Sequence, residues 1–355
     1  MRHSSEETLH HLPTAILGAG SWGTALALHL SRLGQEVRLW TMDTAHSTTM
    51  CAERENKRYL PTLTFPETLY PTSDLTEALK DVEDILIAIP SAGFRSTLLK
   101  IKPFLSANSR IYSATKGLDE KTGQLLNEVI KEIFGNKYPY AVLSGPSFAR
   151  EVAIGLPTAV VIASESTSFV NDLSNRFNCK TFRVYSSRDV TGVEICGSIK
   201  NVLAIATGLS DGMGFGANAR SALITRGLAE IVRLGLALGG KLETFMGLAG
   251  IGDILLTCTD NQSRNKRFGL ALSKGLSTSD AMKEIGQVVE GQRNADLVMQ
   301  LARQHHIEMP ITAAVCNILK GTQTPQEAMH DLLSRAPKAE NFEYITGGFN
   351  NKNLG

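Results

Sequence analysis

Strand-like and helical segments alternate along the first half of this 355-residue chain, and then the strands stop. Up to residue 187, short β-branched runs such as DILIAI at 84–89 are separated by segments of helical periodicity. From residue 191 onward only helical periodicity remains. Alternating strands and helices form βαβ units around a mostly parallel sheet. The pattern therefore predicts an α/β fold, in which a mostly parallel sheet is followed by a second, all-helical C-terminal domain.

The element limits follow from the same patterns. We predict strands at 14–18, 37–40, 84–89, 110–115, 140–145, 159–164 and 182–187. We predict helices at 191–211, 217–239, 242–258, 263–274, 279–285, 290–306, 310–320 and 325–334, the last beginning at the capping-box sequence TPQE. The predicted domains are 13–190 and 191–340, and we expect flexible tails at 1–12 and 341–355.

The composition argues against two classes of protein. The formal net charge is +1, whereas a dedicated nucleic-acid binder usually carries a strongly basic face. The sequence contains no run of eighteen uncharged apolar residues, so we expect no membrane span. The start MRHSSEETLHHLP lacks the apolar core of a signal peptide. The five cysteines form no CxxC pair, and the adjacent His305 and His306 point apart on a helix. We therefore expect reduced thiols, a cytoplasmic protein and no metal.

A glycine-rich loop gives the first functional signal. Gly18-Ala-Gly-Ser-Trp-Gly23 follows the first predicted strand and begins the amphipathic run TALALHLSRL. In a Rossmann-like domain such a loop allows backbone N–H groups at a helix N-terminus to reach a pyrophosphate. Glycine loops alone are common, but between a strand and a helix the motif predicts dinucleotide binding. The expected cofactor is NAD or NADP.

The residues after the second strand leave the choice between NAD and NADP open. An acidic residue there would hold the ribose 2′-hydroxyl of NAD, and an arginine would suit the 2′-phosphate of NADP. The sequence has Met42 and then Asp43, which is slightly late and has a second interpretation as a helix cap. Arg54, Lys57 and Arg58 follow, either as phosphate ligands or as a solvated charged run.

Two lysines stand out by their surroundings. Lys200 lies in the apolar helical segment EICGSIKNVLAI, and a lysine rarely enters such a helix without a partner. Burial and a nearby cation would lower the pKa of its amine, which then suits proton transfer. We expect this amine in a cleft between the domains, with a snorkelling lysine as the alternative. Lys116 follows a predicted strand at the carboxyl end, where ligands bind, although an exposed loop lysine is also possible.

Further polar residues lie in the helical part. Asp253 and Thr257 are four apart and share one helix face, so Asp253 either orients Lys200, binds a substrate hydroxyl or is only a charge at a helix N-terminus. In the sequence NQSRN, Arg264 offers a fork suited to phosphate, and Asn265 adds a donor. Ser263 is either a further donor or the cap of the next helix.

Together these segments resemble the bacterial-type NAD(P)-dependent glycerol-3-phosphate dehydrogenases. The resemblance covers about residues 14–335, and it rests on nine segments in order: GAGSWGTALA, NKRYLP, AIPS, ATKGL, LSGPSFA, GSIKNVLAIATG, GLAGIGDILLTCT, SRN and VEGQ. Many members carry a basic residue or histidine where Met42 stands here, and this departure keeps the question of NADP open.

The resemblance implies roles for particular residues. Lys200 is expected to be the general base, with Lys116 and Asp253 as further catalytic residues. The residues expected on or near the substrate are Lys116, Gly145, Ser147, Lys200, Asp253, Ser263, Arg264 and Asn265. Those expected near the cofactor are Gly18, Gly20, Ser21, Trp22, Gly23, Phe94, Lys116, Ala149, Arg264, Val288 and Glu290.

The implied reaction interconverts dihydroxyacetone phosphate and sn-glycerol 3-phosphate by hydride transfer with NAD(P)H. The resemblance also implies a homodimer that supplies glycerol 3-phosphate for phospholipid synthesis. Two alternatives share the glycine loop: a related 3-hydroxy acid or 6-phosphogluconate dehydrogenase, and an NAD(H)-sensing module without turnover. A preference for phosphate over carboxylate substrates, and turnover itself, would distinguish them.

Overall fold

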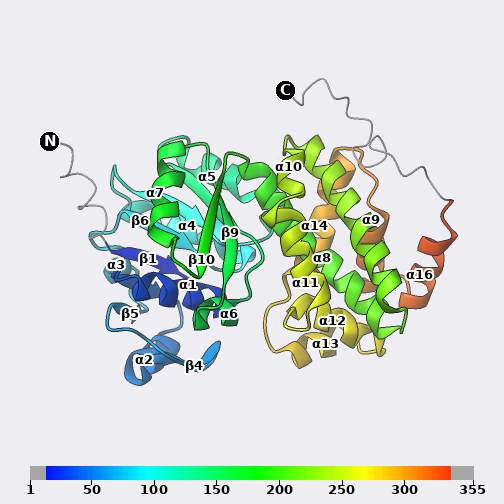
Figure 1. The fold of residues 1–355 in the computed structure, drawn as a ribbon, viewed down its shortest axis with the longest axis horizontal. Helices are drawn as coiled ribbons and strands as arrows, with labels where there is room; N and C mark the ends of the chain where they lie inside the picture. Colours follow the sequence, from blue (N-terminus) through cyan, green and yellow to red (C-terminus); the bar gives the residue numbers. More distant parts are fainter. Residues whose placement is uncertain (1–12, 337–355) are drawn as a thin grey trace. The chain divides into compact units, whose positions relative to one another are not determined.

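The computed structural model describes residues 13–336, which divide into two compact units (Figure 1). The first comprises the described residues up to Thr115 together with Leu126–Val190, and the second comprises Lys116–Leu125 and the described residues from Thr191. The limits expected from the sequence were continuous, whereas here the short segment 116–125 belongs to the helical unit. The predicted tails, 1–12 and 341–355, lie outside the described residues.

A mostly parallel sheet forms the centre of the first unit, as predicted. Within the described residues it has eight strands in the order β10-β9-β8-β7-β6-β1-β2-β5. Neighbouring strands run parallel except β8 and β9, which are antiparallel. The strands are β1 (Thr14–Leu17), β2 (Val37–Trp40), β5 (Leu69–Thr72), β6 (Asp84–Ile87), β7 (Arg110–Ser113), β8 (Tyr140–Ser144), β9 (Thr158–Ala163) and β10 (Phe182–Ser187).

Helices cover both faces of this sheet, because successive strand residues point to opposite sides. In β1, Ile16 packs into one hydrophobic cluster with residues of α1, α6 and α7, while Ala15 and Leu17 pack into another with residues of α3, α4 and α5. Because both faces of the sheet bury hydrophobic residues, the strands have continuous hydrophobic runs. The helices are α1 (Ser21–Arg32), α2 (Thr44–Glu53), α3 (Leu75–Leu79), α4 (Phe94–Ile101), α5 (Leu126–Phe134), α6 (Ala149–Ile154) and α7 (Thr167–Phe177).

The region between β2 and β6 contains strands that sequence reasoning missed. β3 (Glu55–Asn56) and β4 (Leu60–Thr64) form a small antiparallel pair, and β5 is the last strand of the large sheet. Pro61 and Pro71 interrupt these runs, and proline is typical of loops. It is tolerated in β5 because an edge strand needs hydrogen bonds on one side only.

The glycine loop lies where the order of strands in the sheet reverses. From β1 the chain continues to β2 and β5 on one side, and then crosses to β6 on the other. Ligands of such sheets bind outside the carboxyl ends of the strands where the order reverses. Gly18 follows β1 at this position, and α1 begins at Ser21.

The second unit is helical throughout its described elements. The helices are α8 (Val190–Gly212), α9 (Gly216–Ala237), α10 (Leu242–Phe245), α11 (Asp253–Thr259), α12 (Arg264–Ser273), α13 (Thr278–Ile285), α14 (Glu290–Gln304), α15 (Pro310–Leu319) and α16 (Pro325–Ser334). The helix predicted at 242–258 is instead α10, a π-helical turn and α11, because Gly250 leaves the helical conformation with φ −91° and ψ −105°. The capping box before α16 is confirmed at Thr324 and Glu327.

The core of the helical unit also contains a carboxylate. Glu230 of α9 is 2% exposed and accepts hydrogen bonds from the backbone N–H groups of Ile311 (2.6 Å) and Thr312 (3.2 Å). These groups lie in the first turn of α15 and have no partner within their own helix. Burial raises the pKa of Glu230 to about 7, although the hydrogen bonds oppose the rise. The carboxylate is thus a cap supplied by a neighbouring helix.

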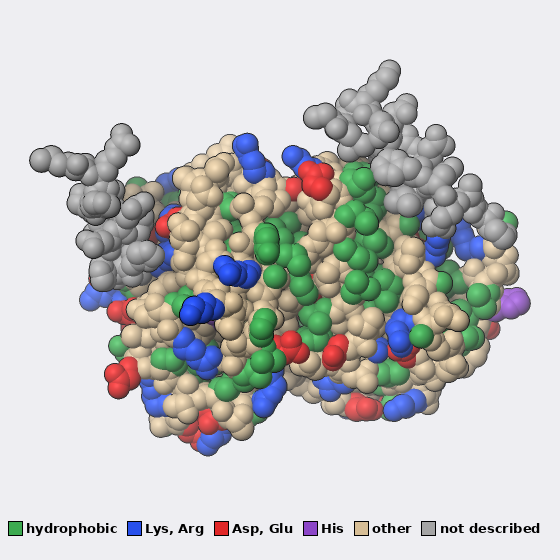
Figure 2. Space-filling model, in the orientation of Figure 1, with side chains coloured by type: hydrophobic (Ala, Val, Ile, Leu, Met, Phe, Trp, Pro, Cys, Tyr) green, Lys and Arg blue, Asp and Glu red, His purple; other side chains and the backbone are tan. Residues whose placement is uncertain are grey.

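Two stretches of this unit are long and apolar enough to cross a membrane by length and composition: Val190–Gly212 and Leu242–Thr259. In the first, 94% of the apolar window is buried, so α8 is the core helix of the unit. In the second, which is interrupted at Gly250, 44% is buried. Hydrophobic side chains are also visible on the surface of this unit (Figure 2), and within the second stretch Met246 and Leu255 are 57% and 46% exposed.

Candidate functional site

The glycine loop of the first unit is shaped by close backbone contacts. Gly18 has φ +123°, and a Cβ atom there would lie 2.4 Å from the carbonyl oxygen of Ala88. A Cβ atom on Gly23 would lie 1.9 Å from the carbonyl oxygen of Gly18. A Cβ atom on Gly20, in contrast, would meet nothing within 4 Å. Two glycines are therefore required by packing, and the middle one keeps a space open over the N-terminus of α1.

Of the two residues after Gly20, one forms a side-chain hydrogen bond within the protein and the other does not. Ser21 donates a hydrogen bond to the carbonyl oxygen of Tyr59 (2.9 Å). The indole Nε1 of Trp22 is buried and has no hydrogen-bond partner in the structure. A buried donor without a partner is unfavourable and is often satisfied by a ligand or water. Phe94 is fully buried in the core at the start of α4, so its side chain shapes the sheet end by packing.

Three further predicted residues follow β8. Gly145 has φ +144°, a left-handed conformation that favours glycine, and a Cβ atom there would lie 3.0 Å from the Cα atom of Val160. Ser147 donates a hydrogen bond to the carbonyl oxygen of Gly145 (2.9 Å), and Ala149 begins α6. The structure thus brings these three together in one turn at the carboxyl end of a central strand.

The helical unit brings three of the predicted catalytic residues into direct contact. The ammonium of Lys200 donates to Asp253 Oδ1 (2.5 Å) and to Thr257 Oγ1 (2.9 Å). The ammonium of Lys116 donates to Asp253 Oδ2 (2.7 Å). Thr257 in turn donates to the backbone carbonyl of Asp253 (2.6 Å). One carboxylate therefore joins two lysines that are 84 positions apart in the sequence.

Burial determines the electrostatics of this cluster. The side chains of Lys200 and Asp253 are 7% and 2% exposed, and that of Lys116 is 18% exposed. Desolvation lowers the pKa of Lys200 to about 8, since the attraction of Asp253 only partly opposes burial and Lys116 adds repulsion. Burial alone would raise the pKa of Asp253, but the two ammonium groups outweigh it and hold this pKa below the ordinary value.

A second polar group surrounds the N-terminus of α12. Ser263 caps the helix by accepting a hydrogen bond from the backbone N–H of Lys266 (3.2 Å). Of the two roles that the sequence left open for Ser263, the helix cap is therefore confirmed. Arg264 donates to Gln287 Oε1 (3.1 Å). Asn265 donates to Asn201 Oδ1 (3.0 Å) and accepts from the N–H of Gly291 (2.9 Å).

The first residue of α14 completes this group. Glu290 has a buried Oε2 atom without a hydrogen-bond partner in the structure. Burial raises the pKa of Glu290 to about 7, and Arg264 opposes the rise. The predicted Val288 lies two positions before it, in the same turn as Gln287. This corner of the unit holds a partly buried guanidinium and a carboxyl group that lacks full hydrogen bonding.

Sequence reasoning missed two participants. Asn201 directly follows Lys200 in its apolar segment, and only the structure shows that its side-chain oxygen accepts a hydrogen bond from Asn265. Gln287 was not noticed at all, because a single glutamine before a helix carries no pattern. Thr257 was noticed through its spacing from Asp253, and the same helical spacing explains how both reach Lys200.

Comparison with known proteins identifies the family of this chain. The family model described as "NAD-dependent glycerol-3-phosphate dehydrogenase N-terminus" matches residues 13–170, and the corresponding C-terminus model matches residues 189–330. The chain belongs to this family.

This chain covers nearly the whole length of several similar proteins. A glycerol-3-phosphate dehydrogenase [NAD(P)+] of Coxiella burnetii is 55% identical over 92% of this chain and 98% of its own. That of Haemophilus influenzae is 52% identical with the same coverage. A crystal structure of the Coxiella burnetii enzyme has a TM-score of 0.90 at 54% identity, covering 92% of this chain and 100% of its own. The enzyme of Saccharomyces cerevisiae has a TM-score of 0.78 at 26% identity, covering 92% and 99%.

The residues of the first unit fit the dinucleotide that the family uses. The open space over Gly20 and the N-terminus of α1 would receive a pyrophosphate, because helix N-termini favour anions. The unpartnered Nε1 of Trp22 offers a donor beside the same helix start. The family's NAD(P) cofactor therefore suits this loop.

Replacing the middle glycine tests the fit. Gly20→Ala should leave thermal stability about unchanged, since the added methyl group meets no protein atom. It should weaken NADH binding roughly tenfold or more, because the methyl group occupies the space of the pyrophosphate. Differential scanning calorimetry and titration of tryptophan fluorescence with NADH measure the two effects. Gly23→Ala, whose Cβ atom would clash with the carbonyl of Gly18, should instead lower the melting temperature. Normal NADH binding by Gly20→Ala would contradict this placement of the cofactor.

Proposed function

We propose that this chain interconverts dihydroxyacetone phosphate and sn-glycerol 3-phosphate with NAD(P)H, and that Lys200 transfers the proton. The observation that carries the proposal is the single buried carboxylate, Asp253, shared by the ammonium groups of Lys200 and Lys116. A nucleotide-sensing module would not need a lysine whose pKa is lowered to about 8 by burial. Perturbed groups of this kind are typical of catalytic sites.

The protein side of the reaction follows from these contacts. When bound, the nicotinamide supplies or accepts the hydride. In reduction, the ammonium of Lys200 gives a proton to the C2 oxygen of dihydroxyacetone phosphate, and in oxidation the neutral amine takes the proton of the C2 hydroxyl. Asp253 and Thr257 hold the Nζ atom in position through hydrogen bonds of 2.5 and 2.9 Å. An ammonium has three donors, so one remains for the substrate oxygen.

Lys116 acts on the same oxygen in a different way. Its ammonium is bound to the second oxygen of Asp253 and is slightly more exposed than Lys200. A positive charge in a poorly solvated site favours the negative charge that develops on the C2 oxygen. The same charge helps to lower the pKa of Lys200. We therefore assign Lys116 to electrostatic stabilisation and Lys200 to proton transfer.

The phosphate of the substrate is assigned to Arg264. Its guanidinium forms a hydrogen bond to Gln287 and keeps further donors for an anion. Asn265 uses its oxygen and one N–H in contacts with Gly291 and Asn201, so it contributes one remaining N–H and holds α14 in place. Ser263 is the helix cap and retains its hydroxyl hydrogen for a phosphate oxygen. Binding the remote phosphate aligns C2 with the reacting groups.

We also infer a homodimer in the cytoplasm that supplies glycerol 3-phosphate to phospholipid synthesis. The apolar stretch Leu242–Thr259 is partly exposed, with Met246 57% and Leu255 46% exposed, and is suited to burial against a second copy. The free cysteines, three of them buried, fit a reducing compartment. Sedimentation of the 38.4 kDa chain as a monomer at micromolar concentration would contradict the dimer.

Replacing Lys200 tests the proton transfer. Lys200→Ala should lower kcat by roughly 10²–10⁴-fold in both directions, since general acid–base catalysis contributes about that much. Lys200→Arg should keep the positive charge but fail in oxidation, because a guanidinium does not deprotonate. In the unmodified protein, kcat/KM for oxidation should rise with pH to a plateau above about 8, and that for reduction should fall above it. Rates at 340 nm across pH 6–10 measure these effects.

The exposed lysine Lys283 provides a matched control in the same unit. Lys283→Ala should leave the rates and the pH profile unchanged. NADH binding by Lys200→Ala, followed by tryptophan fluorescence, should stay intact and exclude misfolding. A pH profile for Lys200→Ala identical to that of the unmodified protein would remove Lys200 from proton transfer.

Replacing Arg264 tests the phosphate contact. Arg264→Ala should lower kcat/KM for dihydroxyacetone phosphate roughly 10- to 100-fold, because hydrogen bonds between charged groups are lost. Most of the loss should appear as a higher KM. Arg267, an exposed arginine on the same helix, is the control, and Arg267→Ala should change little. If the unmodified protein oxidises glycerol as well as glycerol 3-phosphate, the assignment of a phosphate-binding site is wrong.

A further inference from the structure

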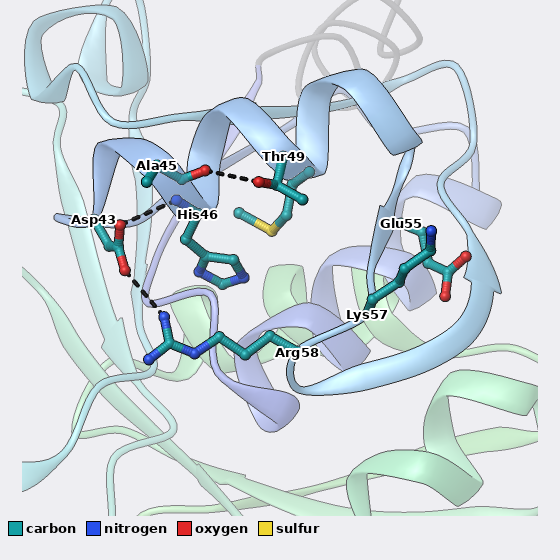
Figure 3. A pocket seen from close by; sticks show the side chains of 8 residues that line it. Asp43, Ala45, His46, Thr49, Glu55, Lys57 and Arg58 are labelled. Atoms are coloured by element: carbon teal, nitrogen blue, oxygen red, sulfur yellow. Dashed lines mark hydrogen bonds and ion pairs between the residues drawn. The ribbon is translucent and has the colours of Figure 1, made fainter.

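A pocket of about 240 Å³ lies in the first unit beyond the carboxyl end of β2 (Figure 3). Asp43 follows β2 and caps α2, and the side chain of Arg58 extends across the pocket toward it (Figure 3). The lining residues are Asp43, Ala45, His46, Thr49, Met50, Glu55, Lys57 and Arg58. The pocket is thus built from α2 and the loop between β3 and β4, a region without an assigned role.

Buried hydrogen bonds fix this loop to the glycine loop. Asn56 is fully buried, and its side-chain amide donates to the carbonyl of Ala19 (2.9 Å) and to Thr24 Oγ1 (2.8 Å). Its side-chain oxygen is 3.0 Å from Nε2 of His46, which lines the pocket. Ser21 of the glycine loop donates to the carbonyl of Tyr59. The pocket therefore has a fixed position relative to the space over Gly20.

That position determines which part of a dinucleotide lies nearby. With the pyrophosphate at the N-terminus of α1, the adenosine ribose reaches the carboxyl end of the second strand. NAD carries a 2′-hydroxyl at this ribose, and NADP carries a phosphate. Met42, at the expected recognition position, is 73% exposed, and its thioether is only a weak acceptor that cannot donate a hydrogen bond to a phosphate. Neighbouring side chains are therefore the candidates for recognising the 2′ position.

The structure distinguishes three cations that the sequence left equivalent. Arg54 donates to the backbone carbonyls of Leu69 (2.9 Å) and Pro66, so its guanidinium fixes the backbone beside β5. Lys57 pairs with Glu53, the last residue of α2 (3.0 Å). Arg58 pairs with Asp43 Oδ2 (3.0 Å), its guanidinium lies 5.1 Å from the centre of the Tyr59 ring, and its side chain is 58% exposed. Arg58 is thus the cation next to the end of β2 that can change partners without breaking the fold.

We propose that Arg58 binds the 2′-phosphate of NADP and that Asp43 competes with this phosphate for the guanidinium. The inference rests on the proposed function, because it takes the glycine loop as the pyrophosphate site. The planar fork of arginine matches a phosphate, and exposed ion pairs are weak enough to open for a stronger anion. When NAD binds, the Arg58–Asp43 pair stays closed. The competition limits the advantage of NADP, so that the chain accepts both cofactors.

Isothermal titration calorimetry with adenosine 2′,5′-bisphosphate and adenosine 5′-monophosphate tests this proposal without turnover. Arg58→Ala should weaken binding of the bisphosphate roughly tenfold and leave the monophosphate within about twofold. Asp43→Asn should strengthen binding of the bisphosphate about three- to tenfold, because it frees Arg58 while asparagine still caps α2. The same order should hold for NADPH and NADH titrated against the fluorescence of Trp22 and Trp40, the two tryptophans of the chain.

Lys57→Ala is the matched control, since it removes the same charge from the same loop. It should change neither affinity by more than about twofold if recognition depends on Arg58 rather than on net charge. Equal losses for Lys57→Ala and Arg58→Ala would overturn the proposal, as would unchanged bisphosphate binding by Arg58→Ala. If the unmodified protein binds neither NADH nor NADPH, the proposed function fails instead. If it binds both and Arg58→Ala leaves their ratio unchanged, only the present inference fails.

Discussion

The arrangement of the helical unit depends on the carboxylate of Asp253, which is almost fully buried between two ammonium groups. A buried charge without a partner is very unfavourable, so neither Lys200 nor Lys116 would stay in place without it. Burial lowers the pKa of Lys200 to about 8, Asp253 only partly opposes this effect, and the ammonium of Lys116 adds to the lowering. Asp253 therefore orders the site, while the burial that this order imposes on Lys200 allows its amine to exchange a proton near neutral pH.

Close helix packing supports this cluster. A Cβ atom on Gly208 of α8 would lie 2.1 Å from the backbone oxygen of Lys266, and one on Gly269 of α12 would lie 2.2 Å from that of Ile205. The two helices therefore touch backbone to backbone, which leaves α8 little freedom to rotate or slide. Asn201 then meets Asn265 across the same interface. Because α8 is held in one register, the position of Lys200 is fixed by packing along the whole helix.

The sequence was sufficient for the features that depend on periodicity. The seven predicted strands, the helices after residue 190 other than the one expected at 242–258, and the shared face of Asp253 and Thr257 follow from spacing along one element. Contacts between side chains from distant segments could not be predicted from such spacing. The contact of Lys116 with Asp253 joins residues 137 positions apart, and the contact of Arg264 with Gln287 has no local signal. The strand β5 was missed because its proline is acceptable only at an edge, and the edge is a property of the whole sheet.

Two ion pairs in this chain have the same chemistry and opposite exposure. The pair of Lys200 with Asp253 is buried, so salt screens it little and opening it would leave charges without water. The pair of Arg58 with Asp43 is roughly half exposed, so solvent compensates each partner when the pair opens. A pair of the first kind sets a pKa and a fixed geometry, as proton transfer requires. A pair of the second kind exchanges a partner for a ligand at little cost, as a choice between two cofactors requires.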